Sequence, residues 1–496
     1  MASQPSPSDR RRRVPLRTKL AFASGSIEEA MVAAAGVATM IYYNQVLGVS
    51  PALCGLAFLI ASIADAVSDP LVGSITDAVR TRWGRRHPLM LASALPIAAA
   101  FYAIYQPPSA LDERGLFLWL TGSLVSMGIA KDFYALPHNA LGAELTDDYN
   151  ERTSIFGWNY ITGALAGMLI GAFILAVLFP STPEFANGLL DREKYRLLAG
   201  LGAAVCFFAV VYCAMATWDQ IPFLHTPPPR SIGSQYREAF NETWRNLKAL
   251  ATNPSYLSVC LCWFVLAISG GILGVVGAYA MLYGFGFATE QLAIQRFVTL
   301  PGVLLSVPLA LWLSRKLDKK YTVVAMISAS CLLVGSPYVL KLLGLFPPNG
   351  SAAALPVFFA LHTLAYVALP VVPIVINSQM VDIADEHELN TGNRAEGLIF
   401  SVRLFALKAT NGLGAMVAGV GLEVIGFPRN ARPETLTPQV TDGLMFMMGP
   451  LYYFIVFAGV GFALLYRIDR LRHAEILEAL EARRAEHVAA KDPLHV

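Results

Sequence analysis

Twelve long apolar stretches constrain the fold of this chain more than any other feature of its sequence. Each runs for about 20 residues or more between charged residues or Pro and Gly clusters, which is the length a helix needs to cross a bilayer. The stretches lie near residues 20–43, 53–78, 88–106, 115–144, 155–179, 197–218, 255–283, 291–314, 321–344, 353–381, 396–425 and 443–466. Because backbone polar groups find no water in lipid, such stretches fold as helices. The sequence therefore predicts an all-α integral membrane protein with 12 transmembrane helices.

Composition supports this class. Of the 496 residues, 55% are hydrophobic and 15% are charged, which excludes an ordinary soluble globular protein. The apolar stretch after the basic N-terminus is too long for a signal-peptide core and contains Glu28 and Glu29, so we expect an uncleaved first helix. The six cysteines lie in apolar stretches without metal-type spacing, which predicts that they are packing residues.

The apolar stretches form two sets of six on either side of a polar stretch. We expect a basic cytoplasmic N-terminus (1–19), an N-terminal six-helix bundle (20–218), a cytoplasmic central loop with an amphipathic helix (219–254), a C-terminal six-helix bundle (255–466) and a cytoplasmic tail (467–496). Two sets of equal size indicate an internal duplication. A related basic loop follows the second stretch of each set, at residues 80–86 and 314–320.

Lysine and arginine residues predict the orientation in the membrane. They are concentrated in the N-terminus, the loops at 80–86 and 314–320, the central loop and the tail, which all fall on one side of a twelve-span chain. The basic side of a membrane protein faces the cytoplasm. We therefore expect a multi-pass protein of the inner cell membrane with both termini in the cytoplasm. The tail has a helical pattern, and a role in binding a partner stays open.

Two aspartates lie deep inside the second apolar stretch. Asp65 and Asp69 are four residues apart, so a helix places them on one face, where two ionised carboxylates repel each other. A charged side chain at the bilayer centre costs about 2.5–3.5 kcal/mol on insertion scales. The pair therefore predicts a bound cation, a proton or a basic partner between these carboxyl groups.

Other ionisable residues also lie where a transmembrane helix is normally apolar. They are Glu28, Glu29, Lys131, Asp132, Arg296, Arg403 and Lys408. Left unpaired they would be expensive, so we expect them to face one another or a water-filled cavity. For Glu28 and Arg296 the alternative is that the side chain reaches water from a helix end. Acids lie mainly in the first set and bases in the eleventh stretch, which indicates a charge-coupled cation site.

The side chains near the aspartate pair suit a small cation. Asp65, Ser68, Asp69 and Asp132 offer hard oxygen ligands for Na⁺, and a carboxylate with a raised pKa could instead hold a proton. The sequence does not choose between these ions, and Asp65 and Asp69 are metal ligands only if the ion is Na⁺.

The fourth apolar stretch has features of a cavity wall. Pro137 interrupts its backbone hydrogen bonds, and His138 and Asn139 add polar groups beside it. In the fifth stretch, Tyr160 could stack on a sugar ring, and it lies a little deeper than the aromatic residues expected to anchor helices at the membrane interface.

Several separated motifs resemble those of a known family. They are Asp-Ala-Val-Ser-Asp-Pro-Leu-Val-Gly at 65–73, Arg-Thr-Arg-Trp-Gly-Arg-Arg at 80–86, Asp-Tyr-Asn-Glu-Arg-Thr at 148–153 and the polar run at 385–397. Together with Lys408, they resemble the glycoside-pentoside-hexuronide:cation symporters, the melibiose-permease-like branch of the major facilitator superfamily. The resemblance covers most of the chain and implies the major facilitator superfamily fold, with two six-helix bundles and alternating access.

The resemblance also implies roles for single residues. Asp65 and Asp69 would bind the coupling cation together with Ser68 and Asp132, and Lys408 would link the cation site to the sugar site. The expected substrate-binding residues are Glu29, Lys131, Ala135, Asn139, Tyr160, Arg403 and Lys408. Ala135, Asn139 and Tyr160 stand where the permease has its sugar-binding Asp, Trp and Arg. A galactoside pocket is therefore not preserved.

The predicted function is a secondary active symporter that couples inward H⁺ or Na⁺ movement to uptake of a glycoside or related sugar. Alternatives are symport of another solute, such as a lysolipid or an organic anion, an integral-membrane enzyme that uses the buried carboxylates and His138, and a membrane scaffold. We expect no cofactor besides the coupling ion, no nucleic acid partner and a monomer in the lipid bilayer. The loops at 80–86 and 385–397 are either an inner gate or topology signals.

Overall fold

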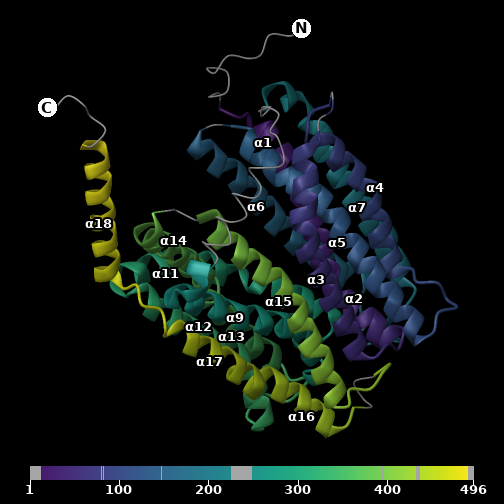
Figure 1. Ribbon diagram of the computed structural model, residues 1–496. Helices are drawn as coiled ribbons and strands as arrows, with labels where there is room; N and C mark the ends of the chain where they lie inside the picture. Colours follow the sequence, from purple (N-terminus) through teal and green to yellow (C-terminus); the bar gives the residue numbers. More distant parts are fainter. Residues whose placement is uncertain are drawn as a thin grey trace. The chain divides into compact units, whose positions relative to one another are not determined.

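The computed structural model describes residues 13–79, 81, 83–146, 148–224, 248–392, 396–431 and 436–489, and these fold almost entirely as helices (Figure 1). The predicted all-α class is confirmed for this part of the chain, where no strand occurs and one isolated bridge joins Thr81 and Gly84. The helices are α1 (Leu16–Ala23), α2 (Ser26–Ile41), α3 (Pro51–Ala78), α4 (His87–Tyr105), α5 (Glu113–Glu144), α6 (Tyr149–Phe173), α7 (Lys194–Ala216), α9 (Pro254–Tyr279), α10 (Thr289–Val298), α11 (Leu300–Lys316), α12 (Lys319–Leu342), α13 (Ala354–Ala368), α14 (Val371–Thr391), α15 (Glu396–Val424), α16 (Pro438–Phe446), α17 (Tyr452–Ala463) and α18 (Arg470–Ala489).

Eleven helical segments in the described residues are long and apolar enough to cross a membrane. They correspond to eleven of the expected apolar stretches. The stretch expected at 396–425 coincides with α15, of which Gly412–Val424 counts as a shorter apolar helix. A total of twelve spans stays a prediction. The amphipathic helix expected in the central loop falls at residues 225–247, outside the described residues.

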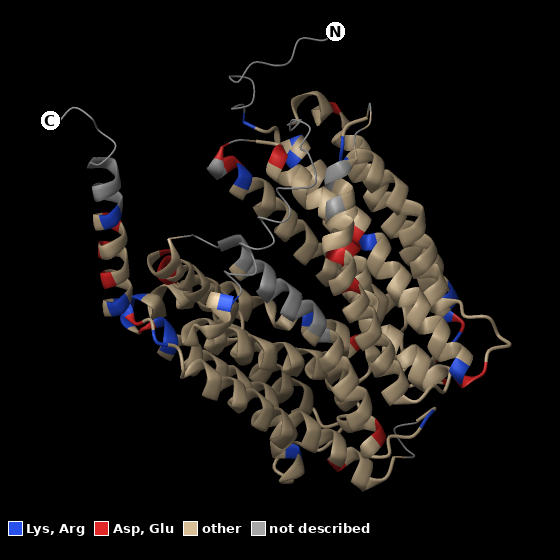
Figure 2. Cartoon of the chain, in the orientation of Figure 1, with Lys and Arg blue, Asp and Glu red and all other residues tan. Residues whose placement is uncertain are grey.

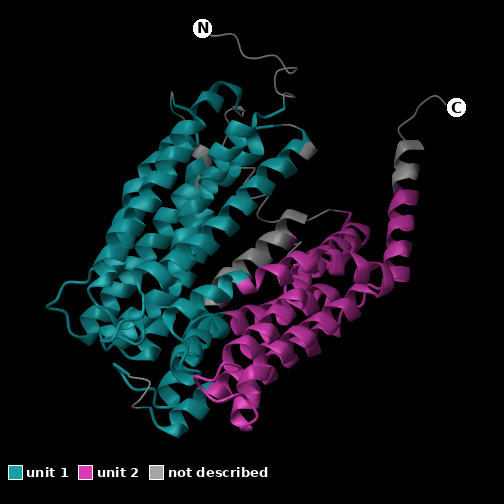
Figure 3. Ribbon diagram, turned by 180° about the vertical axis from the view of Figure 1, so that it is seen from behind, with its two compact units in different colours: residues 1–228, 271–297, 411–444 teal, residues 229–270, 298–410, 445–496 magenta. Residues whose placement is uncertain are grey.

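The chain divides into two compact units (Figure 3). Unit 1 comprises residues 1–228, 271–297 and 411–444, and unit 2 comprises residues 229–270, 298–410 and 445–496. Segments 271–297 and 411–444 follow the central loop in the sequence, yet they pack with the N-terminal helices in unit 1. The expected bundle boundaries at 20–218 and 255–466 stay a prediction.

Unit 1 is built around α5. Helix α3 packs along one side of α5, α4 packs against α5 and α7, and α2 packs against α6 and α7. Aromatic side chains fill the core between these helices, and Phe101, Tyr105 and Tyr195 are at most 1% exposed. The Tyr43 hydroxyl donates a hydrogen bond to the Ile104 carbonyl over 2.8 Å, which satisfies a polar group inside this apolar core.

Capping residues and ion pairs fix the helix ends of unit 1. Asp112 caps α5 by accepting a 2.8 Å hydrogen bond from the Gly115 amide, and Asp148 caps α6 in the same way through Glu151. At the predicted cytoplasmic ends, Arg86 pairs with Glu144 over 2.9 Å, and Lys19 pairs with Glu151 over 2.7 Å. The basic loop at 80–86 is thus tied to the end of α5.

In unit 2, α12 packs against α13, α14 and α17, while α18 packs on α14. The predicted tail helix is α18, and its Ile476 and Leu480 are at most 2% exposed. Asp382 of α14 accepts hydrogen bonds from Lys319 over 2.7 Å and from the Tyr466 hydroxyl over 3.2 Å. Burial raises the pKa of Tyr466, so its hydroxyl stays protonated and able to donate.

Candidate functional site

The expected cation ligands come together where α3 and α5 run side by side. The Ser68 hydroxyl on α3 donates a 2.5 Å hydrogen bond to Asp132 Oδ2 on α5. One turn earlier on both helices, Asp65 Oδ1 lies 3.2 Å from the place that a Cβ on Gly128 would take. In both contacts the residue numbers on α5 and α3 differ by almost the same amount, so the two helices run parallel here. Figure 2 shows the acidic positions gathered midway along these helices, where the ribbon is otherwise mostly tan.

Carboxyl groups of both helices share this place. Asp132 is 3% exposed, and it interacts electrostatically with Asp65 and through a side-chain hydrogen bond with Asp69. Two carboxyl groups can form a hydrogen bond only when one of them carries a proton. A cation between them would relieve the same repulsion. The arrangement can therefore hold a proton or a small cation.

Two prolines add oxygen atoms near the carboxyl groups. Pro70 lies inside α3 directly after Asp69, and Pro137 lies inside α5. Proline has no backbone N–H, so the carbonyls of Ala66 and Phe133, four residues earlier, lose their usual helical donor. Such carbonyls are available to a cation or to water.

Lys131 on α5 and Glu28 on α2 extend this group of charged residues. Lys131 interacts electrostatically with Glu28, Glu29 and Asp65. Glu28 is 1% exposed, and its Oε1 has no hydrogen-bond partner in the described part of the chain. The alternative that Glu28 reaches water from a helix end is therefore wrong. We call Glu28, Glu29, Asp65, Asp69, Lys131 and Asp132 the charged cluster.

The sequence analysis named Glu28 among the charged residues that need a partner, but it did not assign Glu28 to the cation or substrate site. Glu28 and Glu29 are adjacent, so a helix turns them about 100° apart, and only one of them can share a given face. The pattern alone does not tell which of the two points into the protein. The decisive information is how α2 packs among the helices of unit 1, which a single sequence does not contain.

His138 is a packing residue in this structure. Its Nε2 lies 2.9 Å from the Phe22 carbonyl oxygen, and its ring stacks on Phe22 with centroids 4.1 Å apart. The side chain is 5% exposed. An enzyme that used His138 as an acid or base would need this ring to reach a substrate, and the observed contacts hold it in the core.

The other expected substrate-binding residues of unit 1 differ in exposure. Glu29 on α2, Asn139 on α5 and Tyr160 on α6 are exposed, and Ala135 is half-buried. Of these, Glu29 interacts with the charged cluster, through Lys131. The side chains of Arg403 and Lys408 lie outside the described residues. Their roles in binding a substrate stay predictions.

A second group of polar contacts lies at the opposite end of unit 1 from the basic loops. We call Ser50, Glu113, Glu423 and Arg429 the outer cluster, because the loops next to them fall on the predicted non-cytoplasmic side. Glu113 accepts a 2.9 Å hydrogen bond from the Ser50 amide and pairs with Arg429 over 3.0 Å. Glu423 accepts a 2.5 Å hydrogen bond from the Ser50 hydroxyl. Segment 423–429 is thereby joined to the starts of α3 and α5.

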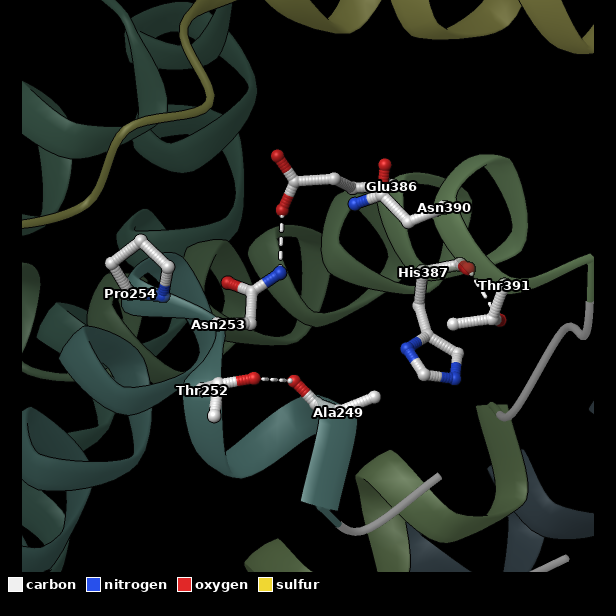
Figure 4. A pocket seen from close by; sticks show the side chains of 8 residues that line it. All are labelled: Ala249, Thr252, Asn253, Pro254, Glu386, His387, Asn390 and Thr391. Carbon is white, nitrogen blue, oxygen red and sulfur yellow. Dashed lines mark hydrogen bonds between the residues drawn. The ribbon is translucent and has the colours of Figure 1, made fainter. Parts of the chain in front are cut away.

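Unit 2 has a pocket of about 320 Å³ where the segment before α9 meets the end of α14 (Figure 4). Its lining residues are Ala249, Thr252, Asn253, Pro254, Glu386, His387, Asn390 and Thr391. Asn253 donates a 2.7 Å hydrogen bond to Glu386, and Thr391 donates one of the same length to the His387 carbonyl. Its lining residues Glu386, His387, Asn390 and Thr391 belong to the run 385–397 that was expected as a loop, and the structure places them in the last turns of α14. In the described part of the chain, no three side chains of His, Cys, Asp or Glu come together in a group that could hold a metal ion.

Comparison with known proteins gives a family match over most of the chain. Residues 21–470 match the family model described as MFS/sugar transport protein. An uncharacterised symporter of Synechocystis sp. is 26% identical, over 94% of this chain and 96% of its own length. The isoprimeverose transporter of Lactiplantibacillus pentosus is 23% identical, over 91% of this chain and 88% of its own length.

A solved structure has the same fold. It is a bacterial homologue of the human lysosomal transporter Spinster in an inward-facing and unoccupied conformation, with a TM-score of 0.65 and 15% sequence identity. The match covers 94% of this chain and 97% of that one. At this identity the likeness concerns the fold alone.

Proposed function

The chain belongs to the MFS/sugar transport family, and from this membership we propose that it couples inward movement of H⁺ or Na⁺ to uptake of a glycoside or related sugar. It is a secondary transporter of the membrane. The observation that carries the coupling is the meeting of Asp65, Ser68 and Asp69 on α3 with Asp132 on α5. Carboxyl groups that lie this close together inside a membrane-spanning helix bundle need a proton or a cation, and this need links ion binding to the state of the protein.

In the proposed cycle, the ion neutralises the Asp65 and Asp69 pair and favours substrate binding. The fully loaded or the empty carrier then changes between inward-facing and outward-facing states. Glu29 and Lys131 interact electrostatically with this group of carboxylates, so a bound ion would change their charge environment and thereby the affinity for the substrate. Lys408 would link the two sites from α15, as the family resemblance implies.

The proposal includes the finer points of topology. The protein has twelve spans, both termini lie in the cytoplasm, and the membrane is the inner cell membrane. It works as a monomer, without a cofactor beyond the coupling ion, and it catalyses no chemical reaction. The isoprimeverose transporter supports a glycoside as the solute. The changed residues Ala135, Asn139 and Tyr160 argue against a galactoside.

Uptake by proteoliposomes tests this function. The purified full-length protein is reconstituted, and radiolabelled pentosides, glucosides, glucuronides and galactosides are offered with an inward H⁺ gradient or an inward Na⁺ gradient, imposed separately. We expect accumulation of at least one non-galactoside glycoside with one of the gradients. Accumulation of a lysolipid or organic anion in place of every sugar would contradict the proposed substrate class. Chemical conversion of the solute would contradict the proposal that the protein is a transporter and not an enzyme.

A further inference from the structure

The pocket at the end of α14 contains a buried histidine with an unpaired ring nitrogen. His387 is 3% exposed, and its Nε2 has no hydrogen-bond partner among the described residues. Figure 4 shows its imidazole ring in the space between Ala249 and Thr391. Buried polar side chains are normally hydrogen-bonded, so a lining residue in this condition points to a ligand that forms hydrogen bonds.

Glu386 and Asn253 form a fixed wall of the same pocket. Glu386 Oε2 accepts a 2.7 Å hydrogen bond from the Asn253 side chain, which leaves Oε1 for a further donor. The Asn253 side chain also accepts a 3.0 Å hydrogen bond from the Tyr256 amide and thereby caps α9. Because Asn253 is held by both contacts, the carboxylate of Glu386 has a defined position before any ligand binds.

The lining residues argue against a charged or an apolar ligand. They include no Lys or Arg, which a phosphate or a sugar acid would need. Glu386 is their one acidic residue, and the partial positive charge of the α9 N-terminus at the same place disfavours an ammonium group or a metal ion. Ala249 and Pro254 are the apolar lining residues, and they are too small a surface to hold an apolar molecule.

A neutral ligand with several hydroxyl groups fits the remaining groups. The carboxylate of Glu386 accepts hydrogen bonds from hydroxyls, and the imidazole of His387 and the amide of Asn390 can each donate and accept. The volume of about 320 Å³ lies at the lower end of the range of about 300–1,000 Å³ that is usual for ligand pockets. The pocket therefore suits a ligand of the size of one sugar ring.

We propose that this pocket binds a neutral polyhydroxyl ligand the size of a monosaccharide, with Glu386, His387 and Asn390 as the binding residues. This inference goes beyond the proposed function, because the lining residues belong to unit 2 and the charged cluster belongs to unit 1. The pocket lies at the predicted cytoplasmic end of α14, so sugar that is already inside the cell reaches it. A purely structural role of these residues would give the pocket no affinity for a sugar.

Hydrogen–deuterium exchange of the purified full-length protein in detergent tests this site. The probes are D-glucose, D-xylose and myo-inositol, with D-glucuronate as an anionic comparison. We expect at least one neutral probe at millimolar concentration to slow exchange in peptides that cover residues 249–254 and 386–391. D-glucuronate should give no protection there, because no basic side chain lines the pocket.

Substitutions in the pocket show whether the protection comes from these side chains. His387→Phe keeps a ring in place without its hydrogen bonds and should weaken the apparent affinity about tenfold. His387→Leu is judged by the same result if His387→Phe does not fold. Glu478→Gln changes an exposed carboxylate on α18 and should leave the protection unchanged. No protection by any neutral probe, or full protection in a folded His387 variant, would overturn the proposal.

Asp65→Asn separates this pocket from the transport site. The protection of residues 249–254 and 386–391 should be unchanged in this variant, and its loss would overturn the proposal by assigning the effect to the transport site. Protection of the unmodified protein together with an absence of glycoside uptake would contradict the proposed function alone. Uptake without protection would contradict the pocket site alone.

Discussion

At the scale of single residues, the candidate site is defined by charged side chains that lie among apolar helices. Asp132 is 3% exposed and Glu28 is 1% exposed, and both lie in helices long enough to cross a membrane. Such groups cost free energy unless each finds a proton, a cation or a partner. The charged cluster meets this condition with Lys131, the Ser68 hydroxyl and hydrogen-bonded carboxyl groups. Changing one member should therefore alter ion coupling more than folding.

The first prediction concerns the pair on α3. Asp65→Asn or Asp69→Asn should abolish ion-driven accumulation of solute, because an amide cannot gain and lose the charge that couples ion binding to transport. The measurement is uptake with and without an ion gradient, together with the thermal unfolding midpoint. Glu193→Gln changes an exposed carboxylate of the same unit and should have no effect. If either aspartate variant still accumulates solute with an unchanged dependence on the ion gradient, the pair does not couple ion movement to solute transport.

The second prediction concerns the space that Gly128 leaves for Asp65. A Cβ at Gly128 would lie 3.2 Å from Asp65 Oδ1, which is closer than an ordinary van der Waals contact. Gly128→Val should push the carboxylate out of place, lower the apparent affinity for the coupling ion and cost about 1–3 kcal/mol of stability. The control is Gly122→Val on the same helix, where nothing lies within 4 Å. Equal ion affinities in the two variants would argue against this packing.

The sequence predicted this site in part. The spacing of Asp65 and Asp69 and the presence of Asp132 within an apolar stretch were enough to predict a cation site, because such residues are expensive in a membrane wherever the helices lie. Glu28 and His138 were not predictable in this way. Each can point inward or outward according to how the neighbouring helices pack, and the structure buries both, one as a charged group and one as a packing residue against Phe22 of α1.

At the scale of elements, the backbones of α3 and α15 approach each other closely in unit 1. A Cβ on Gly55 would lie 2.7 Å from the Ala415 carbonyl oxygen, and a Cβ on Gly419 would overlap the Pro51 carbonyl oxygen. Further along the helices, a Cβ on Gly412 would overlap the Ser62 side chain and lie 2.9 Å from the Leu59 Cα. Small residues let helix backbones approach closely, as is common in membrane proteins. Backbone atoms cannot turn aside as a flexible side chain can, so a larger residue must separate the helices.

The third prediction uses the buried thiol next to this contact. Gly419→Ala should separate α15 from α3 at this end and expose Cys54, which is completely buried and precedes Gly55 in the chain. Labelling of Cys54 by a membrane-impermeant maleimide, located by peptide mass spectrometry, should increase several-fold. Gly461→Ala is the matched control, because nothing lies within 4 Å of a Cβ there. Unchanged labelling of a folded Gly419→Ala protein would contradict the close contact.

The helices themselves were predictable, and their packing was not. Apolar length identifies a span in any membrane protein, so the expected stretches at 53–78 and 115–144 agree closely with α3 and α5. Contacts such as Gly419 on Pro51 connect segments far apart in the sequence, and a glycine in an apolar stretch looks the same whether it faces lipid or a helix. The same holds for the expected tail helix, because its sequence pattern predicted a helix but not that this helix packs on α14.

At the scale of the whole molecule, a transporter must break and remake contacts in every cycle, so contacts that open should be individually weak. The contacts of the outer cluster are individually weak. Glu113 and Arg429 are 38% and 49% exposed at their side chains, and exposed ion pairs contribute about 0.2–1 kcal/mol. Glu423 adds hydrogen bonds from the Ser50 hydroxyl and the Ala52 amide. A few contacts of this size can hold one state without trapping it.

The fourth prediction is that this ion pair biases the protein toward the state with the outer cluster closed. Arg429→Glu places two carboxylates together and should favour opening at this end, which raises the labelling of Cys54 from outside by roughly fivefold, the ratio that about 1 kcal/mol gives. Adding Glu113→Arg restores the opposite charges in reversed positions and should bring labelling back toward the starting value. The hydrogen bond from the Ser50 amide to Glu113 is lost in the double variant, so recovery should be incomplete.

Salt separates the ion pair from other effects of these substitutions. Exposed charges are screened over about 8 Å at physiological ionic strength and over about 3 Å at 1 M. The difference in labelling between Arg429→Glu and the unmodified protein should therefore shrink in 1 M choline chloride. A purely steric disturbance would keep its size in that salt, and it would not be reversed by Glu113→Arg. Glu423→Gln weakens a neighbouring contact and leaves both members of the ion pair in place. It should therefore raise the labelling of Cys54 by a similar factor with and without the Arg429→Glu substitution, as expected for two contacts that act independently.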